Sequence, residues 1–508
     1  MTHRSIGRRF PQDTSWAPPD PVHTAGLGFE REVIASAPSG LGSTRFLLVV
    51  LVLTCSSFGC AYHPMLMTNV RLLMAQQQYA EALEQVNKVC KSQDDVLCLL
   101  ERGLLLHYAG KYDESNQVFD KAEILTEGLY TKSVSRGAAA FVTSDLALAY
   151  RPRPFEQVLV NYFRALNYMF LGSSEDALVE CRKASDKLAH YSEEQQRPYR
   201  HDAFIEYLTG ILYEWGGETN NAFISYKNAC DAYRTYGEIF GIKAPQDLTC
   251  DLLRTAYAMG FVEEAEEIPA EEREGCRTDL PEPQSELAKV VIFIEQGFVP
   301  ALQEWSINMP ILKSEAKAAS DDPANFSLGM TSRMYGYTYD AGDVKYFLRV
   351  ALPSYRATPI ASQAPSLVLD NRAVAPAECE DIFAIAKAEL DHDMPRIFVK
   401  TIARAIVKYK VSDAAGNKWG DILGKLVNAA TAATEQADLR AWLSLPRAIY
   451  MVTVYVEPGT HTLALAGGLQ ASGSVASPSP DTSTTYPTQT VRLDAQPGTT
   501  NFVRFRQY

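Results

Sequence analysis

Cys60 is the residue whose surroundings best suit a chemical reaction. It follows Gly59, and an apolar run over residues 46–53 lies upstream, directly after Arg45. Such a run is too short to cross a bilayer core, which needs about 20 helical residues, but it fits the apolar part of a signal peptide. The Cys60 thiol could then form a thioether with a diacylglyceryl group, because the small Gly59 gives a signal peptidase access to the preceding peptide bond.

Residues 57–60 resemble a bacterial lipobox, although Ser57 stands where Leu is commonest. The resemblance implies a leader over residues 1–59 and lipidation at Cys60; an ordinary cleaved signal and a buried N-terminal helix are the alternatives. Ala61 stands in place of the Asp that signals inner-membrane retention. This implies an outer-membrane lipoprotein that faces the periplasm and meets the membrane through its lipid, with the inner membrane and the cell surface as alternatives.

Other sequence patterns that perform chemistry are missing. The sequence has no HExxH, GxSxG or P-loop motif, and its eight histidines show no metal-ligand spacing. Asp391, His392 and Asp393 are adjacent, but adjacent side chains point apart on a helix, which predicts a polar surface. The net charge of -13 disfavours nucleic acid, which is bound by clustered Lys and Arg. We therefore expect no catalytic residue, no metal site, no cofactor and no nucleic-acid partner.

Seven cysteines follow Cys60, and this odd number rules out complete pairing within the chain. An oxidising compartment permits a disulfide such as Cys90 to Cys98. The sequence shows no CxxC pair that would bind a metal. The pattern favours buried free thiols among the following residues: Cys90, Cys98, Cys181, Cys230, Cys250, Cys276 and Cys379.

Residues from about 69 to 268 show the spacing of tetratricopeptide (TPR) repeats, in which a small residue, a turn Gly and an aromatic recur over 34 residues. The best match has Gly210, Gly217 and Tyr226, and Gly103 with Gly110 and Phe119 falls in the same frame. Ala165, Gly172 and Cys181 give a third match, and weaker units flank these three. The pattern predicts five helical hairpins, with an insertion over residues 126–155; a helical domain without repeats is the alternative.

In the TPR frame, one face of the first helix of each hairpin usually lines a concave groove. The residues on this face are apolar and aromatic, which suits an amphipathic helix or an extended apolar segment of a protein partner. Packing against the C-terminal β region or the insertion is the alternative. The predicted groove residues are Leu104, His107, Tyr108, Leu166, Met169, Phe170, Tyr207, Ile211 and Trp215.

The pattern changes near residue 285, after an acidic and Pro-rich stretch. Apolar segments at 289–295 and 346–352 predict strands in a β-rich region over residues 286–378. Alternation at 449–455, a Pro458-Gly459 turn and further short apolar segments predict a C-terminal β module over residues 440–508. The predicted fold class is multidomain α+β, with a TPR-like α-solenoid followed by a mainly antiparallel β region that contains two inserted helices.

The inserted helical segment spans residues 379–435. It is predicted as one helix over 378–410, with an interruption at Pro395, and a second over 419–434. A basic row stands four residues apart on the first helix and predicts a solvated face, or a surface for anionic lipid or for the acidic repeats. The row consists of Arg396, Lys400, Arg404 and Lys408.

Residues 155–183 resemble an uncharacterised family of bacterial TPR-containing outer-membrane lipoproteins, and segments 295–300, 349–355 and 438–446 extend the resemblance. The family implies this architecture but no established activity. We therefore expect a lipid-anchored periplasmic scaffold or adaptor that binds protein or peptide partners through its repeats, in cell-envelope assembly or export. The alternative is a lipoprotein that binds cell wall or polysaccharide through its C-terminal β module.

Overall fold

The computed structural model describes residues 62–90, 92, 94–133, 148–195, 200–276, 286–312, 344–355, 364–419, 436–466 and 488–508. Cys60 and the leader lie outside these residues, so lipidation stays a prediction. Most of the second inserted helix predicted at 419–434 also lies outside them. Residues 57–508 form one compact unit. In this unit a helical N-terminal part precedes a strand-rich C-terminal part, which confirms the predicted order of helices and strands.

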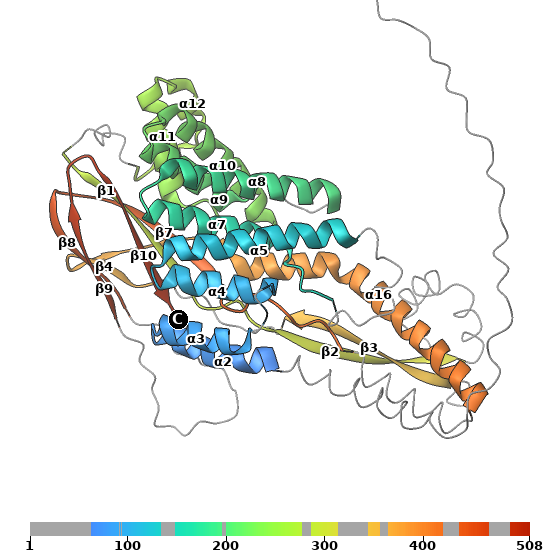
Figure 1. Ribbon diagram of the computed structural model, residues 1–508. Coiled ribbons are helices and arrows are strands. Elements are labelled where there is room, and N and C mark those ends of the chain that lie inside the picture. Colours follow the sequence, from blue (N-terminus) through green and yellow to red (C-terminus); the bar gives the residue numbers. More distant parts are fainter. Residues whose placement is uncertain are drawn as a thin grey trace, which may run out of the picture. The chain divides into compact units, whose positions relative to one another are not determined.

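Among the described residues, the N-terminal helices form five antiparallel pairs, each joined by a short turn (Figure 1). In every pair one residue of the turn has positive φ: Gln77, Gly110, Gly172, Gly217 and Gly260. Glycine adopts this conformation without steric cost, which is why four of these turns are visible in the sequence. The pairs are α2 (Tyr62–Ala75) with α3 (Tyr79–Val89), α4 (Val96–Tyr108) with α5 (Tyr112–Ser133), α7 (Pro154–Phe170) with α8 (Ser174–Gln195), α9 (Ala203–Trp215) with α10 (Thr219–Ile239), and α11 (Gln246–Met259) with α12 (Val262–Glu267), followed by α13 (Ala270–Arg273).

Close helix contact explains the spacing of small and aromatic residues. A Cβ atom on Gly103 would lie 2.6 Å from the ring of Phe119, and one on Gly210 would lie 2.3 Å from the ring of Tyr226. Each aromatic ring therefore packs directly on the glycine of its own hairpin. The hairpin α7–α8 has Ala165 and Cys181 at the same two positions, and both are fully buried.

Gly103→Ala is expected to lower the free energy of unfolding by about 1–3 kcal/mol, because the added methyl group overlaps the ring of Phe119. The effect should shrink in a Phe119→Cys background, which reproduces the Ala165 and Cys181 pair of the neighbouring hairpin. Denaturant unfolding of the two single variants and the double variant measures this coupling. Strictly additive effects would contradict the proposed contact.

The strands form two four-stranded sheets and a two-stranded ribbon. The inner sheet has the order β10-β1-β7-β6, in which β10 pairs with β1 in parallel and the other pairs are antiparallel. The outer sheet has the order β5-β4-β8-β9. The strands are β1 (Ala288–Gln296), β2 (Leu302–Leu312), β3 (Val344–Tyr355), β4 (Leu367–Leu369), β5 (Arg372–Val374), β6 (Ala377–Asp381), β7 (Ala448–Val456), β8 (Gly459–Leu465), β9 (Gln489–Ala495) and β10 (Thr500–Gln507).

Strand β1 separates two hydrophobic cores because its side chains alternate between the two faces of the inner sheet. Val290, Ile292 and Ile294 pack into the core that the outer sheet shares. Val291 and Phe293 pack into the core that the helical hairpins share. The inner sheet therefore lies between the helices and the outer sheet, and all nine residues of β1 are buried.

The long helix α16 (Ile382–Trp419) differs from its prediction in three ways. It begins after Glu378 because residues 377–381 form β6, and it continues through Pro395 without interruption. Pro395 is exposed, so water can solvate the carbonyl group that loses its helical hydrogen bond. The basic row is not a uniformly solvated face either, because Arg404 is only 2% exposed. Helix α16 packs along β3 of the ribbon (Figure 1).

Candidate partner-binding face of the helical repeats

The predicted groove residues are not exposed. Phe170 and Trp215 are half-buried, and the other seven are buried: Leu104, His107, Tyr108, Leu166, Met169, Tyr207 and Ile211. The sequence allowed either an open groove or a covered face. The structure has the alternative that the sequence left open, in which the C-terminal β region packs on this face.

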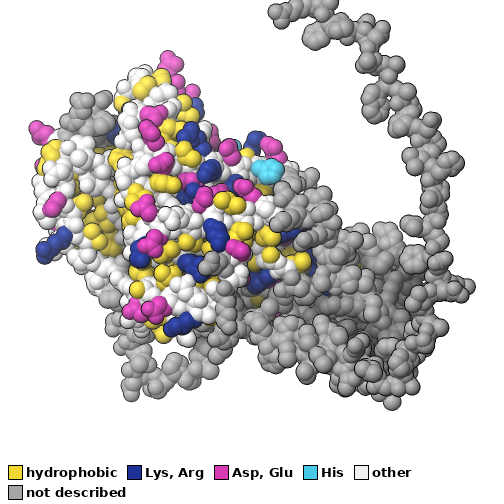
Figure 2. Space-filling view, in the orientation of Figure 1, with side chains coloured by type: hydrophobic (Ala, Val, Ile, Leu, Met, Phe, Trp, Pro, Cys, Tyr) yellow, Lys and Arg dark blue, Asp and Glu magenta, His cyan; other side chains and the backbone are white. Residues whose placement is uncertain are grey.

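Strand β10 covers the aromatic residues at the ends of the first helices. The ring of Trp215 lies 5.1 Å from that of Phe502. The guanidinium group of Arg504 lies 5.0 Å from the ring of Tyr108 and 5.7 Å from that of Phe170. His107, in contrast, binds within the repeats, since its Nδ1 lies 2.6 Å from Oδ1 of Asn167. The visible outer side of α5 and α8 carries intermixed acidic and basic side chains (Figure 2).

An irregular segment, residues 437–446, also lies on the first helices of the hairpins; we call it the resident segment. Glu156 accepts a hydrogen bond from the backbone N–H of Trp442 at 2.9 Å. Glu101 accepts bonds from the N–H groups of Leu443 at 2.7 Å and Ser444 at 3.2 Å. Arg71 donates to the carbonyl oxygen of Leu443 at 2.7 Å. Three of the five hairpins thus hold the backbone of the resident segment.

Trp442 is the largest side chain of the resident segment and is 1% exposed. Its ring lies 5.8 Å from that of Phe119 and 5.9 Å from that of Phe163, both at edge-to-face angles. Its Nε1 donates to Oγ of Ser444 at 3.0 Å, so the one polar atom of the indole has a partner. The segment therefore supplies an aromatic plug between α5 and α7.

A buried charge network joins the fourth and fifth hairpins to β1. Nζ of Lys289 lies 2.9 Å from Glu214 and 3.2 Å from Asp251, and Arg254 binds the same two carboxylates at 2.6 and 2.9 Å. Burial alone would raise the pKa of Glu214, but Lys289 and Arg254 lower it to about 2. Glu214 therefore stays ionised at neutral pH, and the network holds the sheet to α9 and α11.

The first helix of every hairpin contributes a polar contact to the C-terminal region. Besides the groups above, Asp247 on α11 accepts a bond from the N–H of Thr453 on β7 at 2.8 Å. Tyr162 on α7 donates to Glu295 on β1 at 3.4 Å. The face that usually receives a partner is thus occupied by the same chain along all five hairpins. The contacts come from Arg71, Glu101, Glu156, Glu214, Asp247 and Asp251.

Several buried carboxyl groups at this interface have raised pKa values. Burial raises the pKa of Glu101 to about 7, although bonds from Ser444 and Leu443 and the charge of Arg71 oppose it. Burial also raises the pKa of Asp202 and of Asp247 to about 6. Glu380 on β6 lies close to Asp202, and burial followed by that charge raises its pKa well above the usual value. Ionisation of these groups therefore opposes docking.

The free energy of unfolding is expected to fall as the pH rises from 5 to 8. A group whose pKa is raised on folding stabilises the fold while it is protonated. This stabilisation is lost as the pH rises through the folded-state pKa. Asp202 alone contributes about 1.4 kcal/mol across this range. The stabilisation from Glu214, whose pKa is lowered to about 2, is constant there.

Chemical denaturation at several pH values measures this slope. Asp202→Asn removes a titrating carboxyl group and should therefore reduce the slope. The variant should still fold because Asn also caps a helix, as Asp202 does for α9 by accepting a bond from the N–H of Ile205 at 2.9 Å. Stability that rises from pH 5 to pH 8 would contradict the assignment.

Two disulfides are present, which corrects the preference for free thiols. They join Cys90 to Cys98 and Cys250 to Cys276, whose Cα atoms lie 5.6 Å and 5.0 Å apart, within bonding range. Cys181, Cys230 and Cys379 are free.

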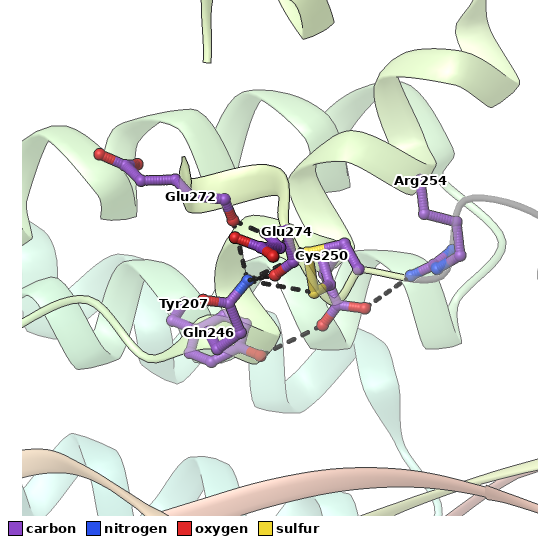
Figure 3. The surroundings of a disulfide bond; sticks show 8 residues. Tyr207, Gln246, Cys250, Arg254, Glu272 and Glu274 are labelled. Carbon is purple, nitrogen blue, oxygen red and sulfur yellow. Dashed lines mark hydrogen bonds and ion pairs between the residues drawn. A yellow bond between two sulfur atoms is a disulfide. The ribbon is translucent and has the colours of Figure 1, made fainter. Parts of the chain in front are cut away.

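The Cys250–Cys276 disulfide ties α11 to the turn after α13 (Figure 3). Beside it, Nε2 of Gln246 donates to the carbonyl oxygens of Glu272 at 2.8 Å and Glu274 at 3.4 Å. The disulfide and Gln246 together fix the end of the helical part. This pairing was not visible from sequence spacing, because the two cysteines are 26 residues apart.

The predicted polar surface on α16 is present, with Asp391 and His392 exposed. Within the described ranges, no group of three or more His, Cys, Asp or Glu side chains could hold a metal ion. Over the same residues, none of the helices has the length and apolar character needed to span a membrane.

Sequence reasoning missed Arg71, Glu101, Glu156, Lys289 and Trp442. Two signals were available. Glu101 and Lys289 are charges inside or beside apolar runs, and such charges are buried only when paired. Glu156 is an acidic residue in the first turn of α7, a position that favours negative charge, and it accepts a bond from the N–H of Arg153 at 2.7 Å.

Comparisons with protein-family models and with curated proteins find no match for this chain. Among solved structures, BtubC (BKLC) from P. vanneervenii is 15% identical over 44% of this chain and 85% of its own, with a TM-score of 0.32. A Podosopora anserina putative kinesin light chain with nearly identical TPR-like repeats is 14% identical over 41% and 93%, with a TM-score of 0.28. PilW, a widely conserved type IV pilus biogenesis factor, is 16% identical over 42% and 92%, with a TM-score of 0.21. These scores do not establish a shared fold, so the repeat assignment rests on the geometry of this chain.

Proposed function

We propose that this chain is a lipid-anchored scaffold of the cell envelope that binds a protein partner. The observation that carries the proposal is the way the repeats hold polypeptide. Glu101 and Glu156 accept hydrogen bonds from backbone N–H groups, and Arg71 donates to a backbone carbonyl. Groups that read the backbone bind extended chains with little dependence on sequence, as a scaffold for protein partners requires.

The proposed anchor and compartment are consistent with the chemistry of the chain. Cys60 stands two residues before α2, so lipidation there would hold the first hairpin close to the membrane. Two acyl chains on the thioether, with a third on the amine, anchor a protein stably, unlike a single chain. The two disulfides favour an oxidising compartment such as the periplasm. An outer-membrane location that faces the periplasm remains part of the proposal.

The alternative, binding of cell wall or polysaccharide by the C-terminal β strands, has less support. The outward face of the outer sheet carries Thr460, Thr462, Thr490 and Arg492 among its described residues. These described side chains, three threonines and one arginine, offer hydrogen bonds but no aromatic surface on which a sugar ring would stack. We therefore retain the protein partner as the leading function.

Radioactive palmitate labelling of the wild-type chain and of Cys60→Ser in growing cells tests the anchor. The wild type should be labelled and remain with the membrane fraction, and Cys60→Ser should lose both properties. Labelling that persists in Cys60→Ser would contradict the anchor.

Site-specific photo-crosslinking in the same cells tests the partner. A crosslinking residue at exposed Leu72 on α2 should give a discrete protein adduct that is weakened in Cys60→Ser, because the tether places α2 beside its partner. Exposed Val179 on α8 is a second position, on the outer side of the repeats. Failure to form any adduct at either position would contradict a protein partner.

A further inference from the structure

We infer that the face holding the resident segment is a peptide-binding site, which takes a short turn-forming segment of a partner protein with an aromatic side chain at the position of Trp442. The inference rests on the proposed function and names the class of ligand for it. In this structure residues 441–444 of the chain itself fill the site, so the resident segment acts as an internal competitor.

The first support is that the polar groups of the site bind backbone atoms rather than side chains of the resident segment. The three N–H groups from Trp442 to Ser444 all donate to the side chains of Glu101 and Glu156, at 2.9, 2.7 and 3.2 Å. The carbonyl of Leu443 accepts from Arg71. A partner segment that forms the same turn as Leu443 and Ser444 would present its N–H groups and carbonyl oxygen in the same way, so these groups would bind it as they bind the resident segment.

The second support is that the site holds one aromatic side chain between two hairpins. Phe119 and Phe163 belong to different hairpins, and their stacked rings lie 6.5 Å apart, with the indole of Trp442 at edge-to-face angles to both. Aromatic anchors in desolvated pockets carry most of the binding energy in protein interfaces. The pocket therefore sets the requirement for an aromatic residue, whereas the carboxylates set only the direction of the chain.

The third support is that the ends of the resident segment are held by other elements. Ala437 donates its N–H to Glu304 on β2 at 3.0 Å, and Leu445 accepts from the N–H of Val299 at 3.1 Å. The middle of the segment, in contrast, adopts neither helix nor strand, and it is held by hydrogen bonds to the repeats. A competing peptide needs to replace only residues 441–444, while the ends stay on the β region.

The test uses a fluorescent synthetic peptide with the sequence of residues 437–446, ADLRAWLSLP, and the purified full-length chain. Trp442→Ala empties the aromatic pocket, and we expect it to bind the peptide at least tenfold more tightly than the wild type does. A peptide with Ala in place of its Trp should bind at least tenfold more weakly. Adding Glu101→Gln to Trp442→Ala should also weaken binding, because one acceptor oxygen is lost.

Trp442→Leu provides a second variant if Trp442→Ala does not fold, since Leu fills part of the pocket and should give an intermediate affinity. Equal binding to Trp442→Ala and to Trp305→Ala, or no binding to either pocket variant, would overturn the inference. A wild-type dimer that dissociates when the peptide is added would show that two copies exchange their resident segments. The site would then serve self-association, and the inference of a partner protein would be wrong. The peptide assay needs neither cells nor the lipid. A negative peptide result would therefore contradict only this inference, and a negative crosslinking result would contradict only the proposed function.

Discussion

Trp442→Ala is expected to lower the free energy of unfolding by about 3–5 kcal/mol, which is the usual cost of truncating a large buried aromatic side chain. Trp442 is 1% exposed and contacts rings on two different hairpins. Its removal leaves a cavity between α5 and α7 that the backbone contacts of Glu101 and Glu156 keep open. Denaturant unfolding followed by circular dichroism measures the loss.

Trp305→Ala is the matched control, because Trp305 on β2 is 50% exposed. Its loss should change the free energy of unfolding by less than about 1 kcal/mol. Similar effects of the two substitutions would show that the resident segment is not anchored by its indole.

Lys289→Met is expected to lower the free energy of unfolding by about 3 kcal/mol at pH 7. Removal of one member of a buried charge network leaves its partners uncompensated, and the usual cost is about 3–5 kcal/mol. Here Arg254 still contacts Glu214 and Asp251, which places the expected loss at the lower end. Thermal and denaturant unfolding at pH 7 and at pH 5 measure the effect.

The pH dependence of this variant has a defined sign. In the wild type, Lys289 and Arg254 hold the pKa of Glu214 at about 2 despite burial, so its stabilisation is complete above the unfolded-state pKa. Without Lys289 that pKa rises, so protonation of Glu214 should reduce the cost of the substitution at pH 5. Lys387→Met removes an exposed lysine that pairs with Asp391 at 2.7 Å, and it should have almost no effect. A cost for Lys289→Met that grows towards low pH would contradict the network.

The helical hairpins were predictable because their signals are local. Gly110, Gly172 and Gly217 mark turns with positive φ, and the residue that packs on each small residue stands 16 positions later, as at Gly103 with Phe119. These contacts connect helices that are neighbours in sequence. The spacing of residues in one sequence is therefore enough to predict these helical hairpins.

The arrangement of the strands was not predictable in the same way. The segments that form β1, β3, β7, β8, β9 and β10 were recognised, but β2, β4, β5 and β6 were not. Of these four, β4, β5 and β6 are very short or polar. The parallel pairing of β1 with β10 joins Lys289 to Thr500, and no local signal encodes such a distant register. The inner sheet also combines strands from both predicted β segments.

The sequence left open whether the predicted groove is open or covered, and its role in binding a partner stays a prediction. Residues such as Tyr108 and Trp215 do lie on the face that receives polypeptide, yet that polypeptide is β10 of the same chain. An apolar face signals that something covers it but does not distinguish an internal from an external partner. The division into domains and the lipidation at Cys60 stay predictions.

Hydrogen exchange of the backbone amides of Trp442, Leu443 and Ser444 tests most directly whether the repeats hold the resident segment. If Glu101 and Glu156 accept these N–H groups, the three amides should exchange as slowly as those of β1, although the segment forms neither helix nor strand. Glu156→Gln should speed exchange at Trp442 more than at β1. Exchange of the three wild-type amides at the rate of an unprotected loop would contradict the account.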